Sequence, residues 1–354
     1  MNLAKRLECG QLAAAFGRSE PLEGGLRILA ITNMYPTPAR PGQGVFVEQQ
    51  IQGLRAIGLK VKVVFLDRRR DGPGVYLGLE RQVRQAIAEF NPHVLHVMYG
   101  GLMAWRVACR CHAAPLVVTF HGSDLLGENL SGLVRKFISR YGVHCSRRAA
   151  RAADWVIVVA RHLLGALRGW VPAEKVQVIP CGIDLDQFKP RDPALCRKQL
   201  GWDPARFHVV FASSNGDPVK RPDLAQAAVQ KLNGHGINSE LHWLSGVPNA
   251  DVPVWLSASD SLLLTSMHEG SPTIVKEALA CGLPIVSVPV GDVAERIAGL
   301  AGCHLAEPDP ADLARKLKRV RDRGARLKCE ARLAELSHLQ IARRLRQCYA
   351  ELCP

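Results

Sequence analysis

Two glutamates eight positions apart, Glu269 and Glu277, bracket the stretch of this sequence that is best suited to chemistry. The residues before them, 261–266, form an apolar run that predicts a buried strand of a parallel sheet. Ser271 followed by Pro272 is typical of a helix start, because serine caps helix N-termini and proline suits the first helical position. We therefore expect a strand, an acidic turn and a helix that carries Glu277.

A helix N-terminus directly above a parallel strand can bind an anion. Its first amide N–H groups have no partner within the helix, and the helix dipole places partial positive charge there. Here the free amides at the start of the helix would suit a phosphate, and the two carboxylates would accept hydrogen bonds from hydroxyl groups. The stretch indicates a site for a sugar joined to a nucleotide through phosphates, although a plain βα unit with a polar turn is an alternative explanation.

A second polar loop carries two adjacent cations. The predicted strand 209–212 leads into this loop, where Lys220 offers a point charge and Arg221 a planar fork, and both suit phosphate oxygens. A basic surface loop would explain Lys220 and Arg221 equally well if they stood alone. Because the loop would lie at the same sheet edge as Glu269, the two segments together favour a phosphate site.

The first half of the chain also delivers polar residues to a sheet edge. The strand expected at 116–120 is followed by His121, Gly122, Ser123 and Asp124, which suit either chemistry or a helix-capping turn. An earlier loop ends in Gly44 and opens a helix, so it would lie where open α/β sheets bind ligands. It lacks the glycine pattern of dinucleotide-binding enzymes, which weakens the case for a nicotinamide oxidoreductase.

The composition is that of a soluble protein with an excess of positive charge. The chain has 354 residues, enough for two domains, and a formal net charge of +14. This charge favours an anionic partner: nucleic acid, an anionic membrane or a phosphorylated substrate. Only 6% of the residues are aromatic, which disfavours stacking platforms for single-stranded nucleic acid.

Cysteine usage and hydropathy suggest the compartment. The 11 cysteines form no zinc-ligand pattern, so we expect reduced and mostly buried thiols in a cytosolic protein. The first 17 residues lack the apolar core of a signal peptide, and the longest apolar run, 155–160, is too short to cross a bilayer. A cytoplasmic location is therefore expected.

Predicted strands and helices alternate through the chain in two halves. Polar residues and prolines at 189–204 suggest a linker between the halves, and a single last helix is expected at 331–352. Two consecutive α/β halves predict two doubly wound domains that face a cleft. Strands are expected at 26–32, 61–66, 94–98, 116–120, 155–160 and 176–180, and then at 209–212, 240–244, 261–265 and 285–288.

Residues 130–152 have the pattern of a basic amphipathic helix. Apolar residues recur at helical spacing, with Lys and Arg between and beyond them. We expect the apolar stripe to pack in the core and the basic residues to form a solvated face, which would also suit an anionic membrane. The stripe consists of Leu133, Val134, Phe137, Ile138 and Tyr141.

Together these segments resemble the family 4 glycosyltransferases, retaining enzymes of the GT-B fold. The resemblance covers about residues 26–352, and its most specific element is a Glu-x7-Glu pattern, which Glu269 and Glu277 match. Supporting matches are the loop ending at Gly44, the tripeptide that contains His121, and the segments 153–158 and 179–188.

The resemblance implies an α/β architecture of two Rossmann-like domains that face a cleft, with a C-terminal helix crossing back to the first domain. The implied order is a short extension at 1–25, an acceptor-side domain at 26–188, a nucleotide-sugar donor domain at 189–335 and the crossover helix at 336–354.

The resemblance also implies roles for individual residues. Glu269 would contact the donor sugar near the reacting centre, Glu277 would bind the nucleotide ribose, and Lys220 would neutralise the departing diphosphate. His121 would lie beside the sugar, and Gly44 would let the first domain's backbone approach the phosphates. The other donor-binding positions are Asn215, Arg221, Gly270, Ser271, Pro272 and Thr273, and Ser123 and Asp124 are expected on the acceptor side.

Two positions depart from the family pattern. Asn215 stands where the family usually has an arginine, five residues before Lys220, and Arg221 is a candidate to supply the missing charge. The usual pair of glycines before a later glutamate, here Glu295, is replaced by Val290 and Gly291.

The function implied by the resemblance is retaining transfer of a sugar from a nucleoside-diphosphate sugar, with no metal or other cofactor required. The acceptor would be a lipid-linked or polysaccharide precursor in cell-surface glycan synthesis, handled at the inner face of the cytoplasmic membrane. Three alternatives stay open: a non-catalytic module that binds sugar nucleotides or polyanions, a nucleotide-sugar epimerase of the same fold, and a nucleic-acid-binding protein, for which the sequence holds no motif.

Overall fold

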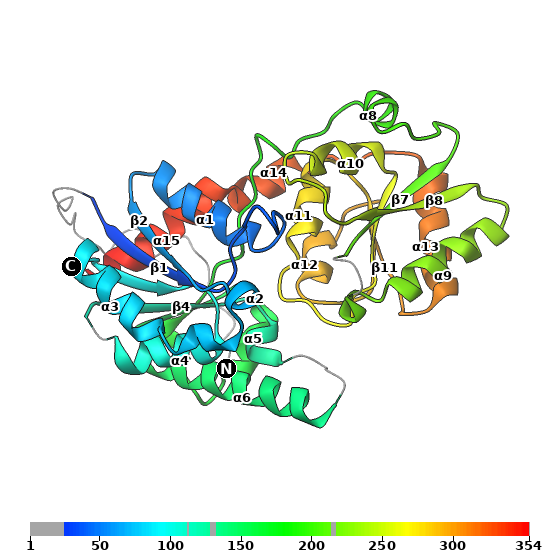
Figure 1. Cartoon of the computed structure of the whole chain (residues 1–354). Coiled ribbons are helices and arrows are strands. Elements are labelled where there is room, and N and C mark those ends of the chain that lie inside the picture. Colours follow the sequence, from blue (N-terminus) through cyan, green and yellow to red (C-terminus); the bar gives the residue numbers. More distant parts are fainter. Residues whose placement is uncertain (1–24, 112, 128–131, 214–216, 354) are drawn as a thin grey trace, which may run out of the picture.

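The computed structural model describes residues 25–111, 113–127, 132–213 and 217–353, which form two α/β lobes joined side by side (Figure 1). Each lobe is built on one sheet, and all the strand pairs described are parallel. This confirms the predicted fold class. The extension expected at 1–25 lies outside the described residues except for Gly25.

The first lobe holds a six-stranded sheet in the order β2-β1-β3-β4-β5-β6. Its strands are short runs rich in Val, Ile and Leu, as expected for strands that are covered by helices on both faces. The strands are β1 (Arg27–Thr32), β2 (Lys60–Phe65), β3 (Val94–Val97), β4 (Leu116–Phe120), β5 (Trp155–Val158) and β6 (Val176–Val178). The main helices are α1 (Val45–Ala56), α3 (Leu79–Phe90), α4 (Gly101–Arg110) and α6 (Leu133–Ala152), and α5 (Ser123–Leu126) is a single turn.

The second lobe holds a five-stranded sheet in the order β11-β10-β9-β7-β8. Its strands are β7 (Phe207–Ala212), β8 (Ser239–Leu244), β9 (Ser261–Leu264), β10 (Ile285–Ser287) and β11 (His304–Leu305). Its helices include α9 (Pro222–Gly234), α10 (Val252–Ala258), α11 (Thr273–Ala280), α12 (Val293–Ile297) and α13 (Pro310–Arg323).

Both sheets reverse their strand order once, between β1 and β3 in the first lobe and between β7 and β9 in the second. Ligands of open α/β sheets bind beyond the carboxyl ends of the strands at such a reversal, because the adjoining loops there lead to helices on opposite faces. The loop with Lys220 follows β7 and the turn with Glu269 follows β9, so these two residues flank the reversal of the second sheet.

The chain returns to the first lobe at its C-terminus. The last helix, α15 (His338–Leu352), lies along α1 (Figure 1). Leu345 and Tyr349 are fully buried in the same apolar cluster as Ile51 of α1. The Tyr349 hydroxyl also forms a 2.7 Å hydrogen bond with His96 Nδ1 beneath the first sheet. The C-terminal helix is therefore part of the first lobe's core.

The linker expected at 189–204 is wrong, because this segment contains helix α8 (Pro193–Leu200). Asp192 caps the helix by accepting hydrogen bonds from the amides of Ala194 and Leu195. Arg197 then joins the helix to the second lobe through a 2.6 Å ion pair with Asp260. An Asp-Pro start and a glycine stop are ordinary helix signals, which the prolines nearby obscured.

The single last helix expected at 331–352 is also wrong. The segment forms α14 (Glu330–Leu333), a short 3-10 turn (Ala334–Leu336) and then α15, whose first turn is capped by Ser337. The break occurs where Ser337 pairs with Ile183 as the chain passes from one lobe to the other.

The apolar stripe of α6, expected in the core, is exposed, so this prediction is wrong. Leu133 is 86% exposed and Phe137 is 71% exposed. Only the second half of the helix packs on the lobe, through Cys145, Ala149 and Ala150. The apolar residues do recur at helical spacing, but they lie on the part of α6 that extends beyond its packing partners.

Candidate active site

The residues predicted to do chemistry surround a cavity of about 390 Å³ between the two lobes. The second lobe supplies the loop after β7 and the turn after β9, and the first lobe supplies α1 and the turn after β4. Of the predicted residues, those that line the cavity are His121, Lys220, Glu269, Gly270, Ser271, Pro272 and Thr273.

The central contact is an ion pair between Lys220 and Glu269, with Nζ 2.6 Å from Oε1. The same carboxylate oxygen accepts a 2.7 Å hydrogen bond from the hydroxyl of Ser266. Both charged side chains are mostly buried, with 27% and 13% of their surfaces exposed. Lys220 and Glu269 are 49 residues apart in sequence, and they meet because β7 and β9 are neighbours in the sheet.

The loop that carries Lys220 is fixed to β9. The Thr265 hydroxyl donates to the carbonyl oxygens of Lys220 and Arg221 at 2.7 and 3.0 Å, and the Met267 amide donates to Val219. Arg221 adopts a left-handed conformation (φ 51°), which a side chain with a Cβ rarely does. These bonds hold the loop in that conformation, so the Lys220 ammonium is preorganised.

The first residues of α11 line the cavity. The helix begins at Thr273 with Pro272 at the cap position, one residue later than the sequence suggests. Ser271 is not the cap: its hydroxyl donates instead to Asp292 at 2.8 Å. Thr273 and Ile274 both line the cavity, and amides in a first helical turn lack intrahelical acceptors, so an anion would meet free N–H groups there.

The loop at Val290 and Gly291 supports the turn that holds Glu269. Gly291 has a φ of 57°, and a methyl group added there would lie 2.6 Å from the Gly270 carbonyl oxygen. The next residue, Asp292, is buried and binds both Ser271 and Arg296 through Oδ2. The departure from the usual glycine pair therefore leaves a loop that packs against the Glu269 turn.

Glu277 lies one turn into α11 and is not part of the cavity lining. Only 8% of the residue is exposed, and burial raises the pKa of its carboxyl to about 7, although the neighbouring Lys276 ammonium opposes the rise. A buried carboxyl of this kind can accept hydrogen bonds from hydroxyl groups most strongly when it is ionised.

The first lobe contributes His121, whose ring packs 4.7 Å from Phe46 and stacks on Tyr99. Burial lowers the pKa of the imidazole to about 3, so His121 is neutral near pH 7. Its Nδ1 atom is 3.7 Å from the Cys181 thiol. A neutral imidazole at this position can donate or accept one hydrogen bond without adding charge to the cavity.

Asp124 and Ser123 are absent from the cavity lining. The Asp124 carboxylate accepts hydrogen bonds from the amides of His121, Gly122 and Gly100, at 3.0, 2.8 and 2.9 Å. Burial raises its pKa to about 6, and the amides oppose that rise. The Ser123 hydroxyl bonds to Tyr99 at 2.7 Å. In this structure Asp124 positions the backbone that carries His121.

The lobes touch through two glycines. A methyl group on Gly122, whose φ is 135°, would lie 2.9 Å from the Gly270 Cα atom, and one on Gly270 would overlap the carbonyl oxygen of His121. Any side chain at either position would therefore force the two turns apart.

Gly44, Arg221 and Asn215 are the remaining predicted positions. Gly44 precedes α1 with a φ of 72°, and a methyl group there would lie 2.5 Å from the Tyr35 amide nitrogen, so its role in the structure is a tight turn. Gly44 and Arg221 are absent from the cavity lining. Asn215 lies outside the described residues.

Lys276 is a site residue that sequence reasoning missed. It is fully buried on α11, and its Nζ atom donates at 2.9 Å to the carbonyl oxygen of Cys181 in the first lobe. Burial lowers its pKa. The available signal was a lysine in the otherwise apolar run before Glu277, where a charged residue is unexpected. Phe46, Cys181 and Ser266, by contrast, gave no local signal, because their roles depend on long-range contacts.

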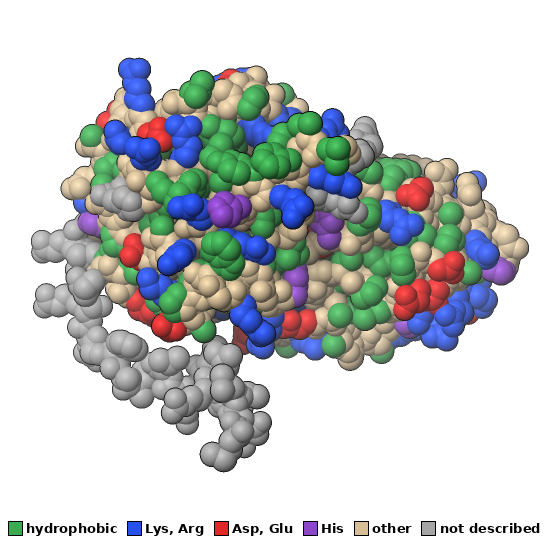
Figure 2. Space-filling view, turned by 90° about the horizontal axis from the view of Figure 1, so that it is seen from below, with side chains coloured by type: hydrophobic (Ala, Val, Ile, Leu, Met, Phe, Trp, Pro, Cys, Tyr) green, Lys and Arg blue, Asp and Glu red, His purple; other side chains and the backbone are tan. Residues whose placement is uncertain are grey.

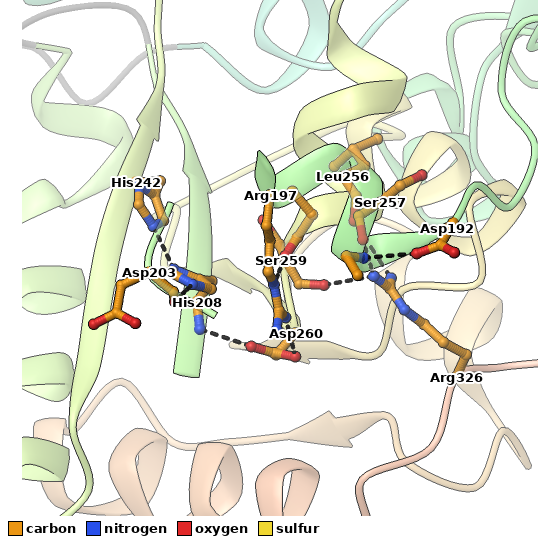
Figure 3. A network of polar contacts seen from close by, with 12 residues as sticks. Asp192, Arg197, Asp203, His208, His242, Leu256, Ser257, Ser259, Asp260 and Arg326 are labelled. Carbon is orange, nitrogen blue, oxygen red and sulfur yellow. Dashed lines mark hydrogen bonds and ion pairs between the residues drawn. The ribbon is translucent and has the colours of Figure 1, made fainter. Parts of the chain in front are cut away.

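Within the described residues one group could bind a metal ion: His208, Glu240 and His242, on β7 and β8. Figure 3 shows His208 and His242 in a polar network with Asp260, with His208 Nδ1 and His242 Nε2 2.8 Å apart. The three candidate ligands are not among the residues that line the cavity. The other ring nitrogen of His208 is 2.8 Å from the Asp203 carbonyl oxygen, and Trp202 stacks on His242. These contacts give the two imidazoles a structural role in the second lobe.

Two family profiles match the chain, one for each lobe. Glycosyltransferase Family 4 matches residues 39–187, and Glycosyl transferases group 1 matches residues 195–322. A Bacillus subtilis (strain 168) protein named as teichuronic acid biosynthesis glycosyltransferase TuaC is 27% identical over 332 residues, which cover 76% of this chain and 82% of that protein. A D-inositol 3-phosphate glycosyltransferase of Frankia alni is 27% identical over 42% of this chain and 44% of its own length.

Solved structures show the same architecture. Sucrose-phosphate synthase from Thermosynechococcus elongatus superposes with a TM-score of 0.71 and 19% identity, covering 92% of this chain and 99% of the other. Anabaena HepE in complex with UDP-glucose superposes with a TM-score of 0.68 and 17% identity, covering 92% and 100%. The profile matches to both lobes show that the chain belongs to the family 4 glycosyltransferases. The superpositions show that it has the GT-B fold.

Proposed function

We propose that this glycosyltransferase takes its sugar from a nucleoside-diphosphate sugar and transfers it with retention of anomeric configuration. The observation that carries the proposal is the Lys220–Glu269 pair beside the N-terminus of α11, at the strand-order reversal of the second sheet. A cation and free helix amides suit a diphosphate, and a carboxylate suits sugar hydroxyls. HepE, a structure of similar fold, was solved with UDP-glucose.

Negative charge develops on the diphosphate as the glycosidic bond breaks. Lys220 and the first residues of α11 line the cavity, so once the donor is bound they would be in place to stabilise this charge. The chain's own groups thus supply the positive charge for departure, and we assign no metal to that step. Arg221, next to Lys220, would add to the local positive charge.

Retention by double displacement would require a carboxylate nucleophile below the anomeric carbon. Among the described residues that line the cavity, Glu269 is the one carboxylate, and it is held by Lys220 and Ser266. Its position suits hydrogen bonds to sugar hydroxyls. We therefore assign a front-side route, in which the acceptor attacks from the side that the diphosphate leaves.

For the acceptor we propose a lipid-linked or polysaccharide precursor, handled at an anionic membrane surface. The net charge of +14 supports an anionic surface. The TuaC relative is named for teichuronic acid biosynthesis, which supports a polysaccharide precursor. We propose that this binding is peripheral. Of the described helices, none has the length and apolar character needed to cross a bilayer.

A thermal-shift screen with nucleoside-diphosphate sugars tests the donor, because a ligand that binds only the folded state raises the melting temperature. The donor that binds is then incubated with and without membrane extracts, and NMR identifies the anomer of the product. Retention and slow donor hydrolysis are expected, whereas donor isomerised without an acceptor would reveal an epimerase.

Glu269→Gln tests the residue assignment, with Glu335→Gln as a matched change of an exposed glutamate. The transfer rate of Glu269→Gln should fall by about 100-fold or more, as for the loss of one preorganised polar contact in a transition state. Near-normal transfer by Glu269→Gln would exclude the role given to this carboxylate.

A further inference from the structure

The first half of α6 is an exposed apolar ridge. Five large apolar side chains on it are exposed to solvent, and the neighbouring Leu126 of α5 is 49% exposed. Such contiguous exposure is unusual for a soluble surface and marks an interaction site. The exposed fractions are 86% for Leu133, 73% for Val134, 71% for Phe137, 55% for Ile138 and 49% for Tyr141.

The ridge points away from the protein. At about 100° per residue the five apolar positions fall within an arc of roughly 140° on the helix. On its opposite side α6 meets the residue after α5 only from Ser139 onward, since a methyl group added at Gly127 would lie 3.1 Å from Ser139 and 3.4 Å from Val143. Residues 133–138 are exposed on every side of the helix, so among the described residues nothing covers the ridge.

Positive charge accompanies the apolar residues. In the first half of α6, Arg135, Lys136 and Arg140 are exposed, and the whole helix contains no acidic residue. Figure 2, which views the molecule from the side of α6, shows hydrophobic side chains interspersed with Lys and Arg on this face. An apolar stripe bordered by basic side chains is the composition of a helix that lies in the interface of an anionic membrane.

We propose that the first half of α6 docks the enzyme on an anionic lipid bilayer, with Leu133, Phe137 and Ile138 entering the boundary between headgroups and acyl chains. A second copy of the chain fits less well, because a symmetric contact of this ridge would bring Arg135, Lys136 and Arg140 of the two copies together. The bilayer instead supplies both an apolar layer and negative charge.

The location suits the proposed lipid-linked acceptor, and in this respect the inference rests on the proposed function. The turn after β4 carries His121, continues into α5, and leads within a few residues to α6. A bilayer bound at the ridge would therefore lie on the first-lobe side of the cavity. The donor residues Lys220 and Glu269 belong to the other lobe.

Vesicle sedimentation tests the docking surface without donor or acceptor. The full chain should bind phosphatidylglycerol vesicles at least tenfold more tightly than phosphatidylcholine vesicles at low salt. The variant Phe137→Ser with Ile138→Ser should lose at least tenfold in binding to anionic vesicles, because it removes most of the inserted apolar surface. Each positive charge that is removed should weaken binding by roughly fivefold. Replacing Arg135 and Lys136 by Glu also adds negative charge, so it should weaken binding further.

Matched controls separate the ridge from the overall charge. Leu195→Ser removes a leucine that is 67% exposed on α8, and Lys316→Glu with Arg319→Glu reverses charges on α13. Vesicle binding should change less than twofold in both. If the α13 variant lost as much binding as the α6 variant, attraction would come from net charge alone and the proposal would be overturned.

A phenylalanine-to-tryptophan change reports insertion directly. Phe137→Trp should bind anionic vesicles as well as the parent chain, and lipids brominated near the headgroups should quench the added fluorescence. Two results would overturn the proposal. One is the absence of quenching. The other is a chain that does not bind vesicles and instead forms a dimer in sedimentation, which Phe137→Ser abolishes.

Failure of the docking surface and failure of the proposed function are distinguishable. The α6 variants should keep the melting temperature of the parent and its thermal shift with the donor, because Lys220 and Glu269 lie on the other lobe. Loss of donor binding in the parent chain would instead count against the proposed function and leave the vesicle result unaffected.

Discussion

The pH dependence of stability should reveal the buried carboxyl of Glu277. Its pKa is raised from an ordinary value of 4.5 to about 7 because burial disfavours the ionised form. The difference corresponds to about 3 kcal/mol at 1.36 kcal/mol per pH unit. We predict that Glu277→Gln, which has no proton to lose, is more stable than the parent at pH 8 by up to this amount.

The sign follows from proton linkage. Between pH 4.5 and 7 the folded chain holds the Glu277 proton more tightly than the unfolded chain, so the parent loses stability as pH rises through this window. Below pH 4.5 the carboxyl is protonated in both states, and the parent and variant should differ little. Above pH 7 the parent has lost the full contribution, and the difference should stay constant.

Urea unfolding at several pH values from 4.5 to 8.5 measures the difference directly. The quantity of interest is the free energy of unfolding of Glu277→Gln minus that of the parent, because other titrating groups cancel in it. Glu335→Gln, at an exposed position, should give a difference that is flat across the range. A Glu277 difference that stayed flat, or that shrank as pH rose, would refute the reasoning.

Ligand binding gives an independent check on Glu277. If ribose hydroxyls donate to the ionised carboxylate, nucleoside diphosphate should bind roughly tenfold more weakly at pH 6 than at pH 8, since the ionised fraction falls by about that factor around a pKa near 7. Glu277→Gln should lose this part of the pH dependence, which separates it from titration of the ligand's own phosphate. An identical pH profile in both proteins would contradict the ribose assignment.

Three further perturbations test the rest of the site. Lys220→Met should lower kcat by about 100- to 1000-fold, because a preorganised charge at the leaving group is lost, and steady-state kinetics with Lys316→Met as the control would show it. Asp124→Asn should lower the free energy of unfolding by about 1 to 3 kcal/mol in urea, because its amide would face backbone N–H donors that now bind a carboxylate. Gly270→Ala should lower kcat by about 100-fold, because its methyl group would overlap the His121 carbonyl oxygen and move the lobes apart, which small-angle scattering would detect.

The strands were predictable from sequence because strands buried on both faces are nearly continuous apolar runs. The expected strand at 116–120 agrees with β4, and the others agree within about two residues at most ends. Helix α8 was not predicted, because its Asp-Pro start lies among prolines that are typical of loops. The exposed ridge of α6 shows a different limit: periodicity reveals that a helix has an apolar face but not what covers that face.

The donor half of the site was also predictable, since Lys220 and Glu269 each follow a strand and parallel strands end at one sheet edge. The contacts between the lobes were not, because they join backbone atoms or side chains with no pattern of their own. The Lys276 bond to Cys181 spans 95 residues, and Gly122 meets Gly270 across the gap between the lobes. Such contacts depend on how two finished lobes pack together.

The two glutamates of the Glu-x7-Glu pattern have different surroundings, since Glu269 is paired with Lys220 and Glu277 is buried, and this difference would help the proposed site to bind a diphosphate. Glu269 balances Lys220 within 2.6 Å, while Glu277, with a pKa of about 7, is only partly ionised near neutral pH. His121 is neutral because its pKa is about 3. In the proposed function, an entering diphosphate would therefore meet little negative charge in the cavity, and as it drew the Lys220 ammonium toward itself it would free the Glu269 carboxylate for the sugar hydroxyls. Donor binding and the release of Glu269 are then one event, which is why removing either partner of the ion pair should impair the same step.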